Sequence, residues 1–161
     1  MKLSRFLPLG IDKKPVIRWL WSGALLGLVC QIFFHNNYFY AKQALYDWKK
    51  PQQILPGAVM APFASLLGYS LYGCVIGMLS MIPLAVYFWS FHYQGSKGIY
   101  TMRRLPRRRE LFLRCFTVPA LGALLYALEL LVLLLLNFAI YWLCTPEQCL
   151  PPFSWAALFG G

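Results

Sequence analysis

The chain has 161 residues, of which 60% are hydrophobic and only 12% are charged, and its mean hydropathy is +0.56. Soluble domains carry about a quarter charged residues, so this composition excludes an ordinary soluble globular domain. The formal net charge of +10 would suggest nucleic-acid binding in a soluble chain. Here the cations gather in blocks beside apolar runs, which is typical of membrane orientation and of binding to anionic lipids. We therefore predict an all-α integral membrane protein with three transmembrane helices and no nucleic-acid partner.

The first apolar run follows a basic head and predicts a transmembrane helix. Residues 1–18 carry five cations, and no small-residue cleavage site follows the apolar residues 19–34. This run is also longer than the ~7–15-residue core of a signal peptide. We predict an uncleaved span over about 16–36, with Pro15 in the first helical turn, where a missing N–H group costs nothing.

The segment after this span is predicted to form an outer loop over residues 37–61. It is rich in tyrosine, phenylalanine, tryptophan and lysine, which are typical of a membrane–water interface. Two interpretations are open. The segment is either a short helix along the membrane surface, ended by Pro51, or a folded loop that caps the spans.

Two further apolar runs predict spans over about 62–90 and 116–143. Each run exceeds the ~20 residues that a bilayer needs, so the helices are expected to tilt or to protrude into water. Pro83 is expected to kink the second span, and Pro119 lies in the first turns of the third.

The outer tail, residues 144–161, is too short for a fourth span and is expected to rest at the interface. Cys144 and Cys149 in this tail are either bridged, if that face is oxidising, or free thiols. Spacing alone does not decide the pairing.

The distribution of cations predicts the orientation. With three spans, the amino terminus and the connection over residues 91–115 share one side of the membrane. That side holds twelve of the fifteen Lys and Arg residues. The positive-inside rule then predicts that both lie in the cytoplasm, with the carboxyl terminus outside a plasma or inner cell membrane.

Small residues at helical spacing predict close packing of the spans. Gly23 and Gly27 lie in the first span, and Gly73 and Gly77 lie in the second. Each pair has the small-x-x-x-small spacing that lets helix backbones approach closely in lipid. The two pairs favour either a tight bundle within the chain or an interface with another membrane subunit or a second copy.

Glu129 is the one acidic residue deep in a predicted span. A charge there is expensive, so the carboxyl group is expected to face protein or water, or to be neutralised. Asn137 lies two turns on and Tyr126 one turn back, on roughly the same face. The group is either a proton or substrate contact or a packing contact to another helix. The lack of a second intramembrane ionisable group favours packing.

The sequence contains no pattern that predicts catalysis, a metal site or a cofactor. The GxxxxGK[ST] pattern of a P-loop is absent. His35 and His92 are far apart in the chain, and the five cysteines fit no metal-ligand spacing. No pair of carboxylates and no nucleophile with a base converge. We predict that the chain is not an enzyme.

The connection between the second and third runs carries the main functional signal. Residues 95–114 hold seven cations and one acid. Ser96 is placed to cap a short helix, on which apolar side chains recur every three residues at Ile99, Met102 and Leu105. The charges are explained if they fix the topology of the chain and bind lipid headgroups. The apolar edge predicts docking, either on the bilayer surface or in a protein groove.

Residues 92–106 (HYQGSKGIYTMRRLP) resemble a loop of small multispanning proteins associated with bacterial ABC transporter ATPases. Their place between two spans also resembles that of the coupling helix of exporter-type ABC permeases. Such permeases have more spans per half and a shorter first outer loop. The resemblance therefore implies that this chain oligomerises or shares its membrane domain with another subunit. It also implies that the following residues enter a groove of a separate ATPase or pair with its acidic rim: Ile99, Tyr100, Met102, Leu105, Arg103 and Arg104.

The sequence thus predicts a membrane-embedded subunit of an ATP-driven, ABC-type transport complex, which engages a cytoplasmic ATPase through residues 95–109. The alternative is a small membrane scaffold that assembles partners through its glycine faces without transport. A third interpretation is a tether to anionic lipid or nucleic acid through Arg107, Arg108 and Arg109.

Overall fold

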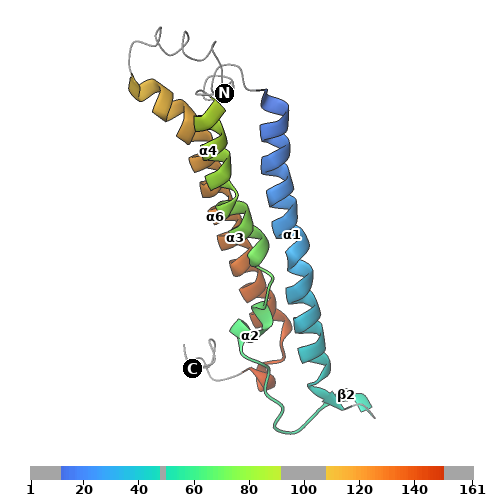
Figure 1. Ribbon diagram of the computed structural model, residues 1–161. Helices are drawn as coiled ribbons and strands as arrows, with labels where there is room; N and C mark the ends of the chain where they lie inside the picture. Colours follow the sequence, from blue (N-terminus) through green and yellow to red (C-terminus); the bar gives the residue numbers. More distant parts are fainter. Residues whose placement is uncertain (1–11, 48–49, 92–107, 151–161) are drawn as a thin grey trace. The chain divides into compact units, whose positions relative to one another are not determined.

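The computed structural model describes residues 12–47, 50–91 and 108–150 (Figure 1). Three helical segments in this part of the chain are long and apolar enough to cross a membrane: Lys13–Gln43, Tyr72–Phe91 and Cys115–Cys144. The prediction of a mostly helical chain with three segments of this kind is confirmed.

The first of these segments is helix α1 (Lys13–Gln43), which has 31 residues. Pro15 lies in its first turn, and Lys42 lies in its last turn, where a cation favours the helix dipole. The helix continues well beyond the predicted end at residue 36. Residues 37–43, which were assigned to the outer loop, therefore belong to the first helix.

A small antiparallel hairpin follows α1. Strand β1 (Tyr46–Asp47) pairs with β2 (Lys50–Ile54), and the Leu55 N–H group donates a hydrogen bond to the Leu45 carbonyl at 3.0 Å. This excludes a surface helix ended by Pro51, because that residue lies within β2. The folded-loop interpretation is the right one. The buried side chain of Leu45 explains it, since it packs into a hydrophobic core rather than facing lipid headgroups.

The second apolar run is interrupted, which corrects the expected single helix over 62–90. Helix α2 (Phe63–Leu67) ends at Gly68, and α3 (Tyr72–Leu79) begins four residues later. Gly68 has a φ of +46°, in the left-handed region that favours glycine. A Cβ atom there would also lie 2.9 Å from the Asn37 amide nitrogen, but this is the end of an exposed side chain that can shift, so the conformation is what selects glycine at the break.

A second irregularity separates α3 from α4 (Met81–Phe91) at Ser80. Its cause is Pro83, which has no N–H group to donate to the Leu79 carbonyl and whose ring crowds that carbonyl. Backbone hydrogen bonds on either side of Ser80 persist, so the two helices still form one segment of 20 residues. The kink expected at Pro83 is therefore present, as a local break in the helix.

The third span belongs to helix α6 (Arg108–Cys144), which has 37 residues and contains Pro119. It begins eight residues before the predicted start at 116, so the end of the predicted cytoplasmic loop is helical. Residues 108–114 (RRELFLR) are mostly strong helix formers, which accounts for the extension. A short 3-10 helix, η2 (Glu147–Cys149), follows α6.

The chain divides into two compact units, each with its own hydrophobic core. Unit 1 contains residues 12–26, 74–91 and 108–129 of the described chain, and unit 2 contains residues 27–47, 50–73 and 130–150. The buried apolar side chains of unit 1 are Val16, Met81, Leu84, Phe88, Cys115, Val118 and Tyr126. Those of unit 2 are Phe34, Tyr38, Leu45, Met60, Phe63, Leu66, Tyr141 and Cys149.

Within each unit, α1 and α6 run in the same direction. In unit 2 three hydrogen bonds join residues separated by nearly constant numbers of positions: Gln31 with Asn137 by 106, Tyr38 with Thr145 by 107, and Lys42 with Cys144 by 102. In unit 1 the Tyr126 hydroxyl reaches the Leu20 carbonyl across 106 positions. In parallel helices the residue numbers of contacting pairs differ by a nearly constant amount. In antiparallel helices the two numbers instead have a nearly constant sum.

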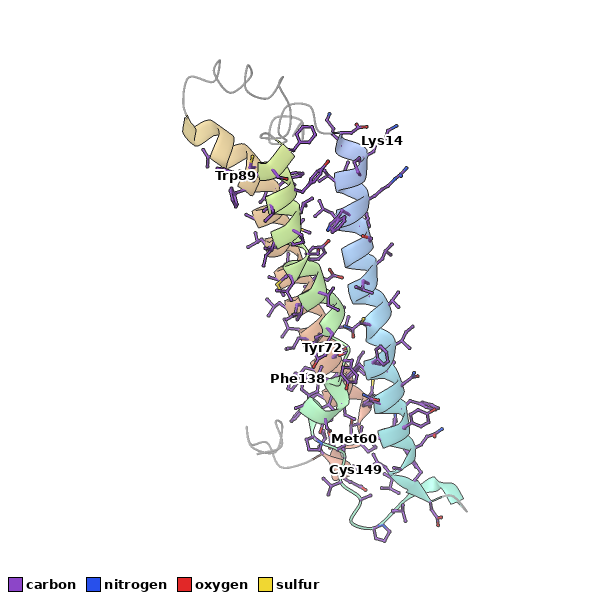
Figure 2. The ribbon with its side chains drawn as sticks, in the orientation of Figure 1. Lys14, Met60, Tyr72, Trp89, Phe138 and Cys149 are labelled. Atoms are coloured by element: carbon purple, nitrogen blue, oxygen red, sulfur yellow. The ribbon has the colours of Figure 1, made fainter. Side chains whose placement is uncertain are left out.

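The outer faces of the spans are covered with apolar side chains (Figure 2). In the most apolar stretch of α6 only 17% of the residues are buried, although this is the most hydrophobic of the three segments. Water-soluble proteins rarely expose contiguous apolar patches above a few hundred Å². The surface is therefore compatible with a multi-pass membrane protein, whose hydrocarbon surroundings favour such faces.

Candidate functional site

The ring of Tyr126 packs against two of the predicted packing glycines. Its hydroxyl donates a hydrogen bond to the Leu20 carbonyl at 2.8 Å. A Cβ atom on Gly23 would lie 2.7 Å from the ring carbon that bears the hydroxyl, and one on Gly77 would lie 3.3 Å from the ring. The two glycines therefore make room for an aromatic side chain of α6. Gly27 and Gly73, the other members of the two pairs, are buried.

A groove between α1 and α6 of unit 1 contains Glu129. Its volume is about 460 Å³, and its walls are almost entirely apolar. Within the residues that the structure describes, Glu129 makes no hydrogen bond and no ion pair. The residues that line the groove are Ile17, Leu20, Trp21, Ala24, Gly122, Leu125, Tyr126 and Glu129.

The polar character of this groove comes from Glu129. The Tyr126 hydroxyl, a second polar group in the lining, already donates a hydrogen bond to the Leu20 carbonyl. The Trp21 side chain is 65% exposed, so its indole is available at the mouth of the groove. A carboxylate in an apolar setting interacts strongly with any cation that approaches, because little water screens it.

Asn137 has a different role from the one expected of a neighbour of Glu129. It is fully buried in unit 2, and its amide donates a hydrogen bond to the Gln31 side-chain carbonyl at 2.9 Å. The remaining atoms of this pair, Asn137 Oδ1 and Gln31 Nε2, are buried without a hydrogen-bond partner. Asn137 belongs to unit 2 and Glu129 to unit 1.

Sequence reasoning missed the partner of Asn137. The available signal was Gln31 itself, an amide side chain near the end of the first apolar run. Polar side chains in apolar helices are expected to find one another, because hydrocarbon offers them no alternative partner. A search for amide residues in both runs would have suggested this pair.

The cysteines of the outer tail are not bridged to one another. Cys144 is exposed at the end of α6, and Cys149 is buried in the core of unit 2. The Cys149 carbonyl accepts a hydrogen bond from the Met60 N–H group at 2.9 Å, and Figure 2 shows these two residues together. Across the described part of the chain, no group of three His, Cys, Asp or Glu side chains is placed to hold a metal ion.

The predicted ATPase-docking residues lie outside the described part of the chain, within residues 92–107. They are Ile99, Tyr100, Met102, Arg103, Arg104 and Leu105. Comparison with known proteins adds no assignment: no protein-family model, no curated protein and no solved structure matches the chain.

Proposed function

We propose that the chain is a three-span membrane subunit of an ATP-driven, ABC-type transport complex. Its amino terminus and the connection between α4 and α6 lie in the cytoplasm, and its carboxyl end lies outside. The observation that supports this topology is the parallel course of α1 and α6 within each unit, with one apolar segment between them in sequence. The ABC-type assignment is supported by the resemblance of residues 92–106. Parallel first and third spans require their starts to share one side of the membrane.

The charges at the helix ends support the orientation. Lys13, Lys14 and Arg18 lie in the first turns of α1, and Arg108 begins α6. On the opposite side the described cations are Lys50, which begins β2, and Lys42, whose ammonium group donates a hydrogen bond to the Cys144 carbonyl at 3.0 Å. The positive-inside rule assigns the cation-rich starts to the cytoplasm.

Labelling of single cysteines tests the orientation. Cys144 is exposed at the end of α6, so it should react with a membrane-impermeant maleimide in intact cells when the other cysteines are replaced by alanine. A cysteine introduced by Asp12→Cys, at the start of α1, should react only after the membrane is permeabilised. The opposite pattern would reverse the orientation, and labelling of both in intact cells would contradict an odd number of spans.

The connection between α4 and α6 is the proposed contact with a separate ATPase. Its apolar edge enters a groove of the ATPase, and its arginines pair with the acidic rim. This use of the loop explains an apolar edge that lipid binding alone does not require. Because the chain carries no ATP-binding pattern, nucleotide hydrolysis belongs to the partner, and this chain is not itself an enzyme.

Purification from the native membrane in mild detergent tests the docking. We expect an ATPase to co-purify with the wild-type chain and to be reduced at least about tenfold by Met102→Asp with Leu105→Asp, because burying a carboxylate in an apolar groove costs more than 1.4 kcal/mol. Met102→Leu is the matched control and should retain the partner.

Recovery of the chain without an ATPase, in a detergent that preserves known complexes, would contradict the transport proposal. Loss of the partner on replacing Arg107, Arg108 and Arg109 with glutamine, but not on the apolar substitutions, would favour a lipid tether. A scaffold that uses the glycine faces has less support, because the ring of Tyr126 packs against both Gly23 and Gly77 within the chain.

A further inference from the structure

The groove of unit 1 has the size and composition of a small-molecule site. Pockets for small ligands measure roughly 300–1,000 Å³ and combine apolar walls with a few polar groups. This groove, of about 460 Å³, has apolar walls from α1 and α6 and a single carboxylate, Glu129. Since the described chain offers that carboxylate no hydrogen bond and no ion pair, the groove is incomplete without an occupant.

The groove defines the charge and the shape of its occupant. Its walls require a molecule with an apolar body. Glu129 requires that this molecule also carry one positive charge, close enough to form an ion pair. Trp21 adds an exposed indole, whose face attracts ammonium and other onium groups. A neutral acyl chain would cover the walls but would give the carboxyl group no partner, so Glu129 would have to carry a proton, whereas a cation allows it to stay charged.

We propose that the α1–α6 groove of unit 1 binds a lipophilic monocation, an apolar molecule that bears one ammonium or other onium group, through an ion pair with Glu129. Leu20, Ala24 and Leu125 contact its apolar body, and Trp21 packs over the cationic group. The inference does not rest on the transport proposal, because binding requires only the isolated chain. If the chain also transports, this groove supplies the substrate class.

Equilibrium binding to the purified full-length chain in lipid nanodiscs tests the proposal. The probe is radiolabelled tetraphenylphosphonium, and the control probe is tetraphenylborate, an anion of nearly the same size and shape. We expect saturable binding of the cation and only non-saturable lipid partitioning of the anion. Glu129→Gln should weaken cation binding at least about tenfold, because it keeps the shape of the side chain and removes the charge.

Matched variants separate a lost site from a lost fold. Glu147→Gln makes the same chemical change in η2, outside the groove, and should leave binding unchanged. Glu129→Asp keeps the charge and should retain saturable binding, and Trp21→Leu should weaken it severalfold without disturbing the core. Thermal unfolding of each variant in the same nanodiscs checks that Glu129→Gln remains folded.

Several outcomes would overturn the proposal. Equal binding of the cation by folded Glu129→Gln and wild type would remove the carboxylate from the site. Saturable binding of tetraphenylborate with equal affinity would leave an apolar groove that does not select charge. Absence of saturable cation binding to the wild type would assign the groove to lipid acyl chains, with Glu129 carrying a proton.

Discussion

Gly23→Ala is expected to destabilise unit 1 by about 1–3 kcal/mol, the usual cost of overpacking a filled site. The added methyl group would lie 2.7 Å from the Tyr126 ring carbon that bears the hydroxyl, so the ring has to move. Movement of the ring also strains the hydrogen bond from its hydroxyl to the Leu20 carbonyl. The loss should appear as a lower thermal unfolding midpoint of the detergent-solubilised chain.

Gly77→Ala is the matched control, because it makes the same change near the Cγ end of the same ring. Its methyl group would lie 3.3 Å from the ring, a tight contact that a small shift relieves. The better helix propensity of alanine, about 1 kcal/mol, offsets part of this cost. We therefore expect Gly77→Ala to stay near wild-type stability.

A double-mutant cycle identifies the cause of the Gly23 effect. Tyr126→Leu removes the ring atoms that the new methyl group would meet, so Gly23→Ala should cost much less in that background than in wild type. Equal costs in both backgrounds would show that the ring is not responsible. Equal costs for the two glycines in the wild type would contradict the packing described here.

The second large effect concerns the buried amide pair of unit 2. Asn137→Leu and Gln31→Leu should each destabilise the chain by about 1–3 kcal/mol, because each change leaves the other amide buried without its partner. The double substitution should recover most of the loss, since it removes both polar groups together. The measurement is the unfolding midpoint of the two single variants and of the double variant.

Asn37→Leu is a control for the asparagine substitution itself. The Asn37 amide donates a hydrogen bond to the Leu66 carbonyl at 3.2 Å, but its side chain is exposed. Its replacement should therefore cost less than that of Asn137. If the stability lost in the double variant equalled the sum of the losses in the two single variants, the amides would contribute independently rather than as a pair.

The sequence predicts the features of this fold that depend on composition over a long window. Three apolar runs of sufficient length are visible without a structure, and three apolar helices are found. The small-x-x-x-small spacing also singles out Gly23 and Gly77 as positions that admit a close neighbour. Each of these features is decided by residues near one another in the chain.

The features that escaped prediction depend on distant residues. The break at Gly68 is invisible to hydropathy, because the residues on both sides of it are apolar, and its close neighbour Asn37 lies on another helix. The hairpin after α1 forms because Leu45 and Met60 enter a common core. The pairing of Gln31 with Asn137 spans 106 positions, so no local pattern contains it.

The groove around Glu129 was predictable only in part. Its carboxylate is evident in the sequence as the one acid within an apolar run. Its walls come from two helices, whose facing sides depend on their mutual rotation. The docking residues between α4 and α6 stay a prediction from the sequence and its resemblance.

The interruption at Gly68 has a consequence for how the chain fits a bilayer. At 1.5 Å per residue, the 31 residues of α1 rise about 46 Å, whereas a hydrocarbon core is about 30 Å thick. The 20 residues of Tyr72–Phe91 rise about 30 Å and match that thickness without adjustment. Because the chain is interrupted at Gly68, the second apolar segment begins at Tyr72, and α2 packs into the core of unit 2 instead of lengthening that segment beyond the thickness of a bilayer.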